Sequence, residues 1–338
     1  MSTPKKVTFY SFKGGVGRTL ALLDVAVILA RAGQRVVAVD MDLEAPGFHR
    51  YPAIRPPSDD QRGVSDYVLE RLTGAERPVS PYTYRPEVSG VADRLVIIPA
   101  GQRPRELAES IKQLYEPLGD RALIFQLFVT RIVEEFSPDF ILFDSRTGLA
   151  EIAAVCTVEL ADAIVALTGL NPQGIDGLAE VIDRIRKHPA RTRPPAFILA
   201  YGPVPRKEDL EGDAKTISLH SDGLATEVIS FPLATRIAEA QAKLWVQAIA
   251  EDETEVRRWF PDLDPSERLH WMEYDPWIPL VGEDDFDRPG PLREAHRRLA
   301  RSIGRLSGLD LFPELRRAAP QSWLARSQRM ADAVEKLR

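Results

Sequence analysis

The chain has 338 residues, of which 44% are hydrophobic and 28% charged, a composition typical of globular rather than disordered proteins. Its net charge of −6 gives no support to a general nucleic-acid binder. The single cysteine, Cys156, excludes a disulfide framework and any metal site that needs two thiolates from one chain. No signal-peptide pattern and no uninterrupted apolar run of about 18–20 residues occurs, so we expect a cytoplasmic protein.

Short β-branched and aromatic runs alternate with longer helical patterns along the first 240 residues. The strand candidates are residues 7–12, 35–40, 94–99, 139–144, 163–168, 196–200 and 227–231. The helix candidates between them are residues 19–31, 64–72, 105–114, 122–136, 149–160 and 175–187. Most of the strands are continuously apolar, as strands buried on both faces are. The alternation predicts an α/β fold with a doubly wound, mostly parallel sheet and helices on both of its faces.

A glycine-rich loop, S-F-K-G-G-V-G-R-T at residues 11–19, joins the first strand candidate to the first helix candidate. Glycines let the backbone wrap around an anion with its N–H groups pointing inward, and a helix N-terminus adds partial positive charge. Thr19 places a hydroxyl where phosphate-binding loops ligate Mg²⁺. The plainer interpretation is an ordinary glycine turn, but that leaves the nearby cations Lys13 and Arg18 unexplained.

Residues 13–19 resemble the deviant Walker A motif K-G-G-x-G-K-[S/T] of the ParA/MinD ATPases. Further stretches similar to that family follow in its order. They are D-M-D at residues 40–42, L-V-I-I-P-A-G at 95–101, F-D-S-R-T-G at 143–148 and N-P at 171–172. The resemblance covers roughly residues 5–240, and it implies a P-loop NTPase fold with ATP and Mg²⁺ as ligands.

The resemblance also implies roles for individual side chains. Lys13 would reach across an ATP-sandwiched homodimer to the phosphates of the partner, and Asp42 would position or activate the attacking water. Asp144 would be the Walker B acid near Mg²⁺. Thr19 would ligate the ion directly, and Asp40 and Asp144 would hold it through water. The residues expected to bind the nucleotide are Lys13, Gly14, Gly15, Val16, Gly17, Arg18, Thr19 and Tyr201.

Two residues depart from the family pattern, and a third is a guess at the base site. Arg18 replaces the usual second lysine; it keeps the charge, but its planar fork is not equivalent to an ammonium, which leaves the hydrolysis rate open. Arg146 stands where the family commonly has proline, and it either senses the γ-phosphate, faces a partner or is simply solvated. Tyr201 is our prediction for stacking on adenine.

The composition changes after residue 250, so we predict an ATPase domain at 1–250 and a helical C-terminal extension at 251–338 packed on it. Residues 251–287 carry 13 acidic and 3 basic side chains, residues 288–338 carry 12 basic and 5 acidic ones, and we expect the two to pair. Residues 322–338 are weakly similar to the membrane-binding helix of MinD proteins. We favour packing or partner binding there over a membrane or DNA.

Taken together, these features predict a Mg²⁺-dependent ATP hydrolase that acts as a slow homodimeric switch. Its ATP-bound state would engage an unidentified protein partner, and no metal cluster is expected because one cysteine cannot build it. The alternative is a nucleotide-dependent scaffold or sensor with negligible hydrolysis, which Arg18 and Arg146 favour. A tyrosine kinase on a related loop is disfavoured, because the last tyrosine is Tyr274.

Overall fold

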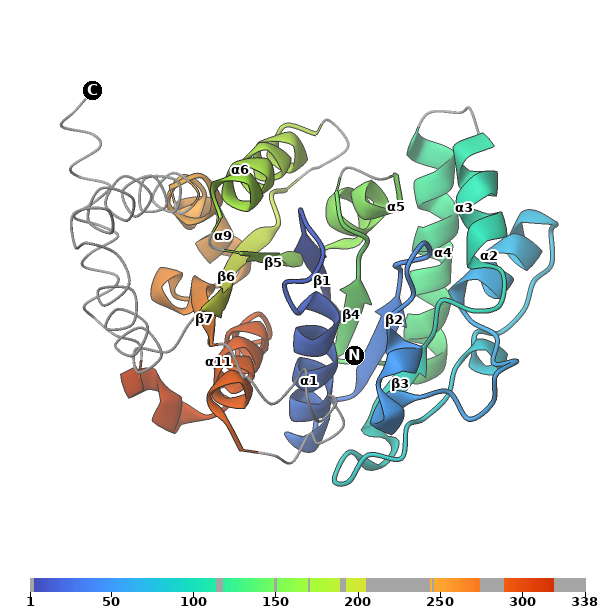
Figure 1. Cartoon of the computed structure of the whole chain (residues 1–338), viewed down its shortest axis with the longest axis horizontal. Helices are drawn as coiled ribbons and strands as arrows, with labels where there is room; N and C mark the ends of the chain where they lie inside the picture. The colour runs from blue at the N-terminus through green and yellow to red at the C-terminus, as the bar shows by residue number, and fades with distance from the viewer. Residues whose placement is uncertain are drawn as a thin grey trace, which may run out of the picture.

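The computed structural model describes residues 3–113, 118–148, 151–169, 171–188, 193–204, 244, 246–273 and 289–318. Within them, seven parallel strands form one sheet in the order β3-β2-β4-β1-β5-β6-β7, with helices on both faces (Figure 1). The strands are β1 (Lys5–Ser11), β2 (Val36–Asp40), β3 (Leu95–Ile98), β4 (Phe140–Asp144), β5 (Ala163–Thr168), β6 (Ala196–Val204) and β7 (Leu269–Glu273). The predicted doubly wound α/β fold is confirmed.

The helices follow the predicted order with small changes at their ends. The longer ones are α1 (Arg18–Arg31), α2 (Val64–Leu72), α3 (Pro104–Gln113), α4 (Leu118–Phe136), α5 (Glu151–Ala154), α6 (Pro172–Arg186), α9 (Glu253–Trp259) and α11 (Pro291–Arg305). Single 3₁₀ turns are η1 (Phe48–Arg50), η2 (Pro52–Ile54), η3 (Ser80–Tyr82), η4 (Ala92–Arg94), η7 (Pro265–Arg268) and η8 (Pro313–Ala318). Two π-helical segments are η5 (Val155–Leu160), which continues α5, and η6 (Val246–Ala250).

The sheet is buried on both faces because alternate side chains of each strand meet different helices. On one face, α1 and α11 pack against Val7 and Phe9 of β1. On the other face, α2, α4 and η5 cover Ile141 of β4, and α6 covers Ile164 of β5. Cys156 of η5 is buried in this second layer, as expected of a small apolar side chain. The continuous apolar runs in the sequence follow from this double cover.

The seventh strand comes from the segment predicted to be a helical extension. β7 pairs in parallel with β6, and α11 packs on α1, so the described part of residues 251–338 shares the sheet and core of the preceding residues. Acidic and basic side chains of this segment also pair as expected, with Arg301 Nη2 2.7 Å from Glu267 Oε1. The strand candidate at 227–231 and the basic stripe at 322–338 lie outside the described residues.

None of the described helices combines the length and the apolar character that crossing a bilayer requires.

Candidate nucleotide-binding site

The candidate site lies at the carboxyl edge of the sheet, where β2, β4 and β1 are neighbours. Asp40 at the end of β2 is in register with Asp144 at the end of β4, and Asp144 is in register with Phe9 of β1. The loops that follow these three strands therefore start side by side. Ligands of doubly wound sheets bind at this edge, which is where the sequence motifs fall.

The glycine-rich loop adopts the backbone that its sequence predicts. Gly15 and Gly17 have φ values of 79° and 78°, a left-handed conformation that side chains with a Cβ rarely adopt. A Cβ at either position would meet no other atom within 4 Å, so the glycines are there for their backbone angles. Gly14, Gly15 and Gly17 are exposed, and Gly17 leads directly into the N-terminus of α1. Exposed N–H groups at a helix N-terminus are suited to bind an anion.

Arg18, the first residue of α1, turns inward from this loop and is 8% exposed. Its Nε donates to Asp144 Oδ1 at 2.6 Å, and its Nη2 donates to Asp42 Oδ2 at 2.7 Å. Its Nη1 lies 3.5 Å from Ser11 Oγ. Burial alone would lower the pKa of Arg18, but Asp144 and Asp42 raise it above its ordinary value. The planar fork of the guanidinium thus bridges two carboxylates that come from different strands.

The second oxygen of Asp144 is engaged as well. Thr19 Oγ1 donates to Asp144 Oδ2 at 2.6 Å, so the hydroxyl and the carboxylate predicted to hold Mg²⁺ lie together. Asp144 is fully buried, and burial raises its pKa although Arg18 and Thr19 act against that shift. A hydroxyl and a carboxylate are oxygen ligands of the kind that Mg²⁺ prefers.

Asp40 anchors the loop that follows β2. Its Oδ1 accepts from the backbone N–H of Asp42 at 3.1 Å, and its Oδ2 accepts from those of Gly47 and Phe48 at 3.0 and 3.3 Å. Burial, together with the nearby Asp144, raises the pKa of Asp40 to about 8. Asp42 Oδ1 accepts from the N–H of Ala45 at 3.2 Å, so both aspartates shape the same turn. The structure therefore gives Asp40 backbone partners within its own loop.

Lys13 does not join the group around Arg18. Its side chain is exposed, and its Nζ donates to Oε1 of Gln173, in the first turn of α6. The start of that helix is capped by Asn171, whose Oδ1 accepts from the N–H of Gly174 at 2.7 Å. The N-P pair of the sequence therefore shapes the helix that Lys13 contacts. Sequence reasoning missed Gln173, since nothing in the local pattern links it to a residue 160 positions away.

Arg146 forms an ion pair with Glu44, so it connects the loop after β4 to the loop after β2. The two side chains are 32% and 37% exposed. This ion pair joins the loops next to Asp42 and Asp144, a contact that the three roles left open for Arg146 did not include. Glu44 was not singled out from the sequence, because its partner is 102 residues away.

Tyr201 is placed differently from what its predicted role requires. It lies in β6 with 1% of its surface exposed, in the core cluster that also contains Ile175 and Leu178 of α6. Burial raises the pKa of its hydroxyl. Because the ring is enclosed by core side chains, it offers no open face to adenine. The expected stacking on the base gains no support from this position.

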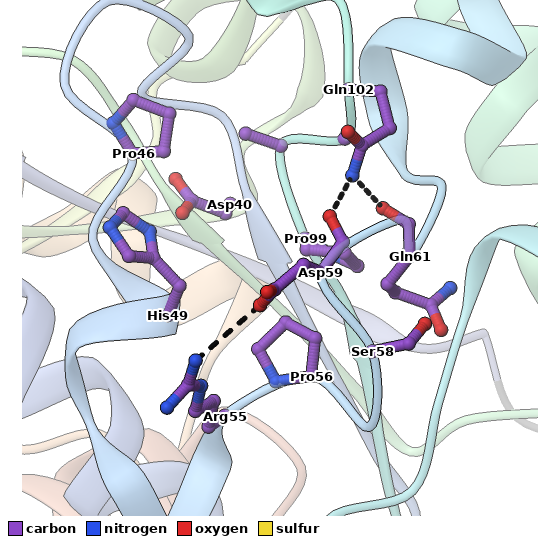
Figure 2. Close-up of a pocket in the computed structure, with 12 residues that line it drawn as sticks. Asp40, Pro46, His49, Arg55, Pro56, Ser58, Asp59, Gln61, Pro99 and Gln102 are labelled. Carbon is purple, nitrogen blue, oxygen red and sulfur yellow. Dashed lines mark hydrogen bonds and ion pairs between the residues drawn. The ribbon is translucent and has the colours of Figure 1, made fainter.

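A cavity of about 260 Å³ lies beside Asp40, beyond the ends of β2 and β3 (Figure 2). His49 and Arg55 line it from the segment between β2 and α2, and Gln102 lines it from the segment after β3. Gln102 Nε2 donates to the carbonyl oxygens of Asp59 at 2.8 Å and Gln61 at 3.0 Å, which closes one wall. The sequence did not predict this cavity, because its two walls, residues 40–61 and 99–102, are far apart along the chain.

Among the described residues, no group of three or more His, Cys, Asp or Glu side chains is arranged to hold a metal ion. Asp42 and Asp144 share Arg18 rather than an open space between them. Any cation at this edge would therefore depend on Thr19, Asp144 and groups supplied by a ligand.

Comparison with known proteins identifies the family. A family model described as an AAA domain matches residues 4–195. The chain belongs to this family. Its sequence motifs resemble those of the ParA/MinD ATPases, and solved structures of such proteins are similar to it in fold. No curated protein matches the chain significantly.

Three solved structures illustrate the likeness. A putative plasmid partition protein from Borrelia burgdorferi B31, bound to AMPPNP, is 13% identical with a TM-score of 0.56 and covers 89% of this chain and 98% of its own. The septum site-determining protein MinD from Pyrococcus horikoshii OT3, with Mg-ADP, is 15% identical with a TM-score of 0.56 over 90% and 98%. The MinC:MinD complex of Aquifex aeolicus is 15% identical with a TM-score of 0.54, and the match covers 88% of this chain and 95% of that one. At these identities the likeness establishes the P-loop NTPase fold.

Proposed function

We propose that this ParA/MinD-type protein is a Mg²⁺-dependent, ATP-binding and ATP-hydrolysing homodimeric switch that engages a protein partner in its ATP-bound state. One observation carries the proposal. The glycine loop meets four polar side chains at the carboxyl edge of the sheet. Arg18 donates hydrogen bonds to Asp42 and Asp144, and Thr19 donates one to Asp144. The similar structures that contain AMPPNP, Mg-ADP or MinC support the proposed ligand and mode of action.

The residues present fit a nucleotide and its metal ion. The exposed glycines Gly14, Gly15 and Gly17, whose backbone N–H groups lie at the N-terminus of α1, and the guanidinium of Arg18 are suited to the phosphates. Thr19 and Asp144 are suited to the ion, whose charge when bound neutralises phosphate oxygens in the transition state. Asp42 supplies a carboxylate that orients a water molecule or accepts its proton. Phosphoryl transfer depends mostly on such positioning and charge, and little on covalent chemistry by the protein.

Lys13 supports the dimeric part of the proposal. It is exposed at the rim of the site and contacts Gln173 instead of the acidic groups that Arg18 engages. A cation in that position is available to the phosphates of a second copy.

The test combines binding, size and turnover. We expect calorimetry to detect ATP binding in the presence of Mg²⁺, and light scattering to detect an ATP-dependent dimer. Lys13→Ala should prevent the dimer, whereas Asp42→Ala should block phosphate release and hold the dimer together. Lys187→Ala is a matched control, because Lys187 is an exposed lysine paired with Asp183 on α6. Absence of ATP binding, or size profiles that no variant changes, would contradict the proposal.

The second candidate is a nucleotide-dependent scaffold or sensor that hardly turns ATP over. The contact between Arg18 Nη2 and Asp42 Oδ2 favours it, because a carboxylate held by a guanidinium is not free to activate water. Phosphate release measured with and without candidate partners separates the two functions. Steady release that disappears in Asp42→Ala would eliminate the scaffold, and binding without release under all conditions would eliminate the hydrolase.

A further inference from the structure

Arg18 occupies the position between the groups that are suited to bind a cation. Its guanidinium contacts Asp144 Oδ1 at 2.6 Å and Asp42 Oδ2 at 2.7 Å, and Thr19 Oγ1 takes the remaining oxygen of Asp144 at 2.6 Å. Both oxygens of Asp144 are thus engaged, and the carboxylate is fully buried. A divalent cation that approached Asp144 alone would lie beside a buried positive charge, in surroundings that strengthen the repulsion.

The same contacts oppose nucleotide binding without a cation. If Arg18 turned from the two carboxylates to the phosphates, Asp42 and Asp144 would be left buried or nearly buried without a counter-charge. Removing one partner of a buried ion pair is strongly unfavourable for that reason. A cation that arrives with the nucleotide supplies the missing counter-charge. The nucleotide therefore draws the Arg18 guanidinium away from the cation position, and the cation neutralises the carboxylates that Arg18 leaves.

We propose that Arg18 is a specificity-determining residue that couples the two ligands: the site accepts a nucleotide and a divalent cation together and rejects either one alone. The inference rests on the proposed nucleotide-binding function and extends it. The coupling depends on the arginine fork, because Nε reaches Asp144 at the end of β4 while Nη2 reaches Asp42 in the loop after β2. A lysine has a single ammonium on a flexible stem and cannot reproduce that bridge. Arg18→Lys should therefore weaken the coupling while keeping the charge.

The first experiment uses Mn²⁺ alone, observed by electron paramagnetic resonance, and needs no nucleotide. We expect the wild-type protein to bind Mn²⁺ weakly and Arg18→Met to bind it about tenfold or more tightly, since the competing charge is gone. Circular dichroism verifies that Arg18→Met is folded, and Arg18→Lys provides a second variant with intermediate affinity. Arg35→Met, which removes an exposed guanidinium paired with Asp139, is the control and should match the wild type. Equal affinities in all four proteins would overturn the proposal.

The second experiment measures AMPPNP affinity by calorimetry with Mg²⁺ and with EDTA. The ratio of the two dissociation constants should be roughly 100-fold in the wild type and in Arg35→Lys, and below about tenfold in Arg18→Lys. Equal ratios in the wild type and Arg18→Lys would overturn the coupling while leaving the proposed function intact. If neither protein bound AMPPNP with Mg²⁺, the proposed function would fail, and the inference that rests on it would fail with it.

Discussion

Helix α1 carries two buried charged side chains of opposite sign, Arg18 in its first turn and Asp24 in its second, and their surroundings differ. Arg18 forms the phosphate-loop cluster with Asp42 and Asp144, at the sheet edge beside exposed glycines. Arg18 begins α1, Asp144 ends β4 and Asp42 lies in the loop after β2. These buried groups lie next to the exposed glycines of the loop.

Asp24 belongs instead to the α1–α11 cluster, which it forms with Arg293 and His296. Asp24 is 2% exposed and His296 is 1% exposed, and each oxygen of Asp24 has its own partner on α11. Its charges join two helices that pack against each other. The two buried charges of α1 therefore differ in their partners: Arg18 contacts residues at the sheet edge beside the glycine-rich loop, and Asp24 contacts a neighbouring helix.

The largest effect is expected from breaking the α1–α11 cluster. Asp24→Ala should lower the free energy of unfolding by about 3–5 kcal/mol, because the buried His296 would lose the carboxylate that its Nδ1 contacts and the partly buried Arg293 would lose this ion pair. Urea denaturation measures the loss. Asp183→Ala is the control, since Asp183 is 46% exposed and pairs with Lys187, which directly follows the same helix. A loss of unfolding free energy no larger than that of the control would show that the α1–α11 cluster does not stabilise the fold.

The next effect is a loss of stability in acid on the α11 side. His270 of β7 is buried with its Nε2 3.0 Å from Ser302 Oγ of α11, and burial lowers its pKa to about 4. The unfolded chain has a histidine pKa of about 6.5, so between these values it binds a proton that the folded chain does not. The contribution is therefore fully present above pH 6.5 and is lost as pH falls toward 4, up to about 3 kcal/mol.

Urea midpoints from pH 7 to pH 4.5 test this, with His270→Gln as the variant that cannot titrate. The difference between wild type and variant isolates His270 from Asp40, whose raised pKa acts in the opposite direction. Parallel pH profiles for the two proteins would contradict the expectation. A similar slope remaining in His270→Gln would point to His296, since burial and Arg293 lower its pKa to about 3.

A smaller effect is expected where the phosphate loop packs on α6. A Cβ at Gly177 would lie 2.2 Å from Cε1 of Phe12, so Gly177→Ala must displace the ring next to Lys13. Overpacking of this kind costs about 1–3 kcal/mol. We expect thermal unfolding at lower temperature and weaker AMPPNP binding. Adding Phe12→Leu should recover part of both losses; strictly additive effects would show that ring and helix are not in contact.

The smallest effect is expected at the partly exposed ion pair between the loops after β2 and β4. Arg146→Gln should change the free energy of unfolding by less than about 1 kcal/mol, because Arg146 and Glu44 are partly solvated. Arg35→Gln, which breaks the exposed pair with Asp139, should behave alike in the same urea titration. A much larger loss of unfolding free energy in Arg146→Gln would show that this pair stabilises the fold as strongly as a buried ion pair does.

Much of the fold and half of the site could be predicted from local patterns. Continuous apolar runs predicted six of the seven described strands, and the glycine loop with the strand-end residues Asp40, Asp42 and Asp144 predicted the edge where they meet. These signals succeed because they are short in range: strand burial, turn geometry and helix starts are set by neighbouring residues. β7 was missed, since its residues 269–273 mix polar and apolar side chains within an acidic segment.

The sequence by itself determined the α/β class, the phosphate-binding loop and the family, because each depends on the order of residues along a short stretch. Only the tertiary structure decided which charges meet. Arg18 is 126 residues from Asp144, and Asp24 is 272 residues from His296. Local sequence patterns do not indicate contacts between residues so far apart in the chain. Strand order and helix packing determine which charged side chains meet. The same packing buried Tyr201 and left Lys13 exposed, although both had been assigned to one ligand.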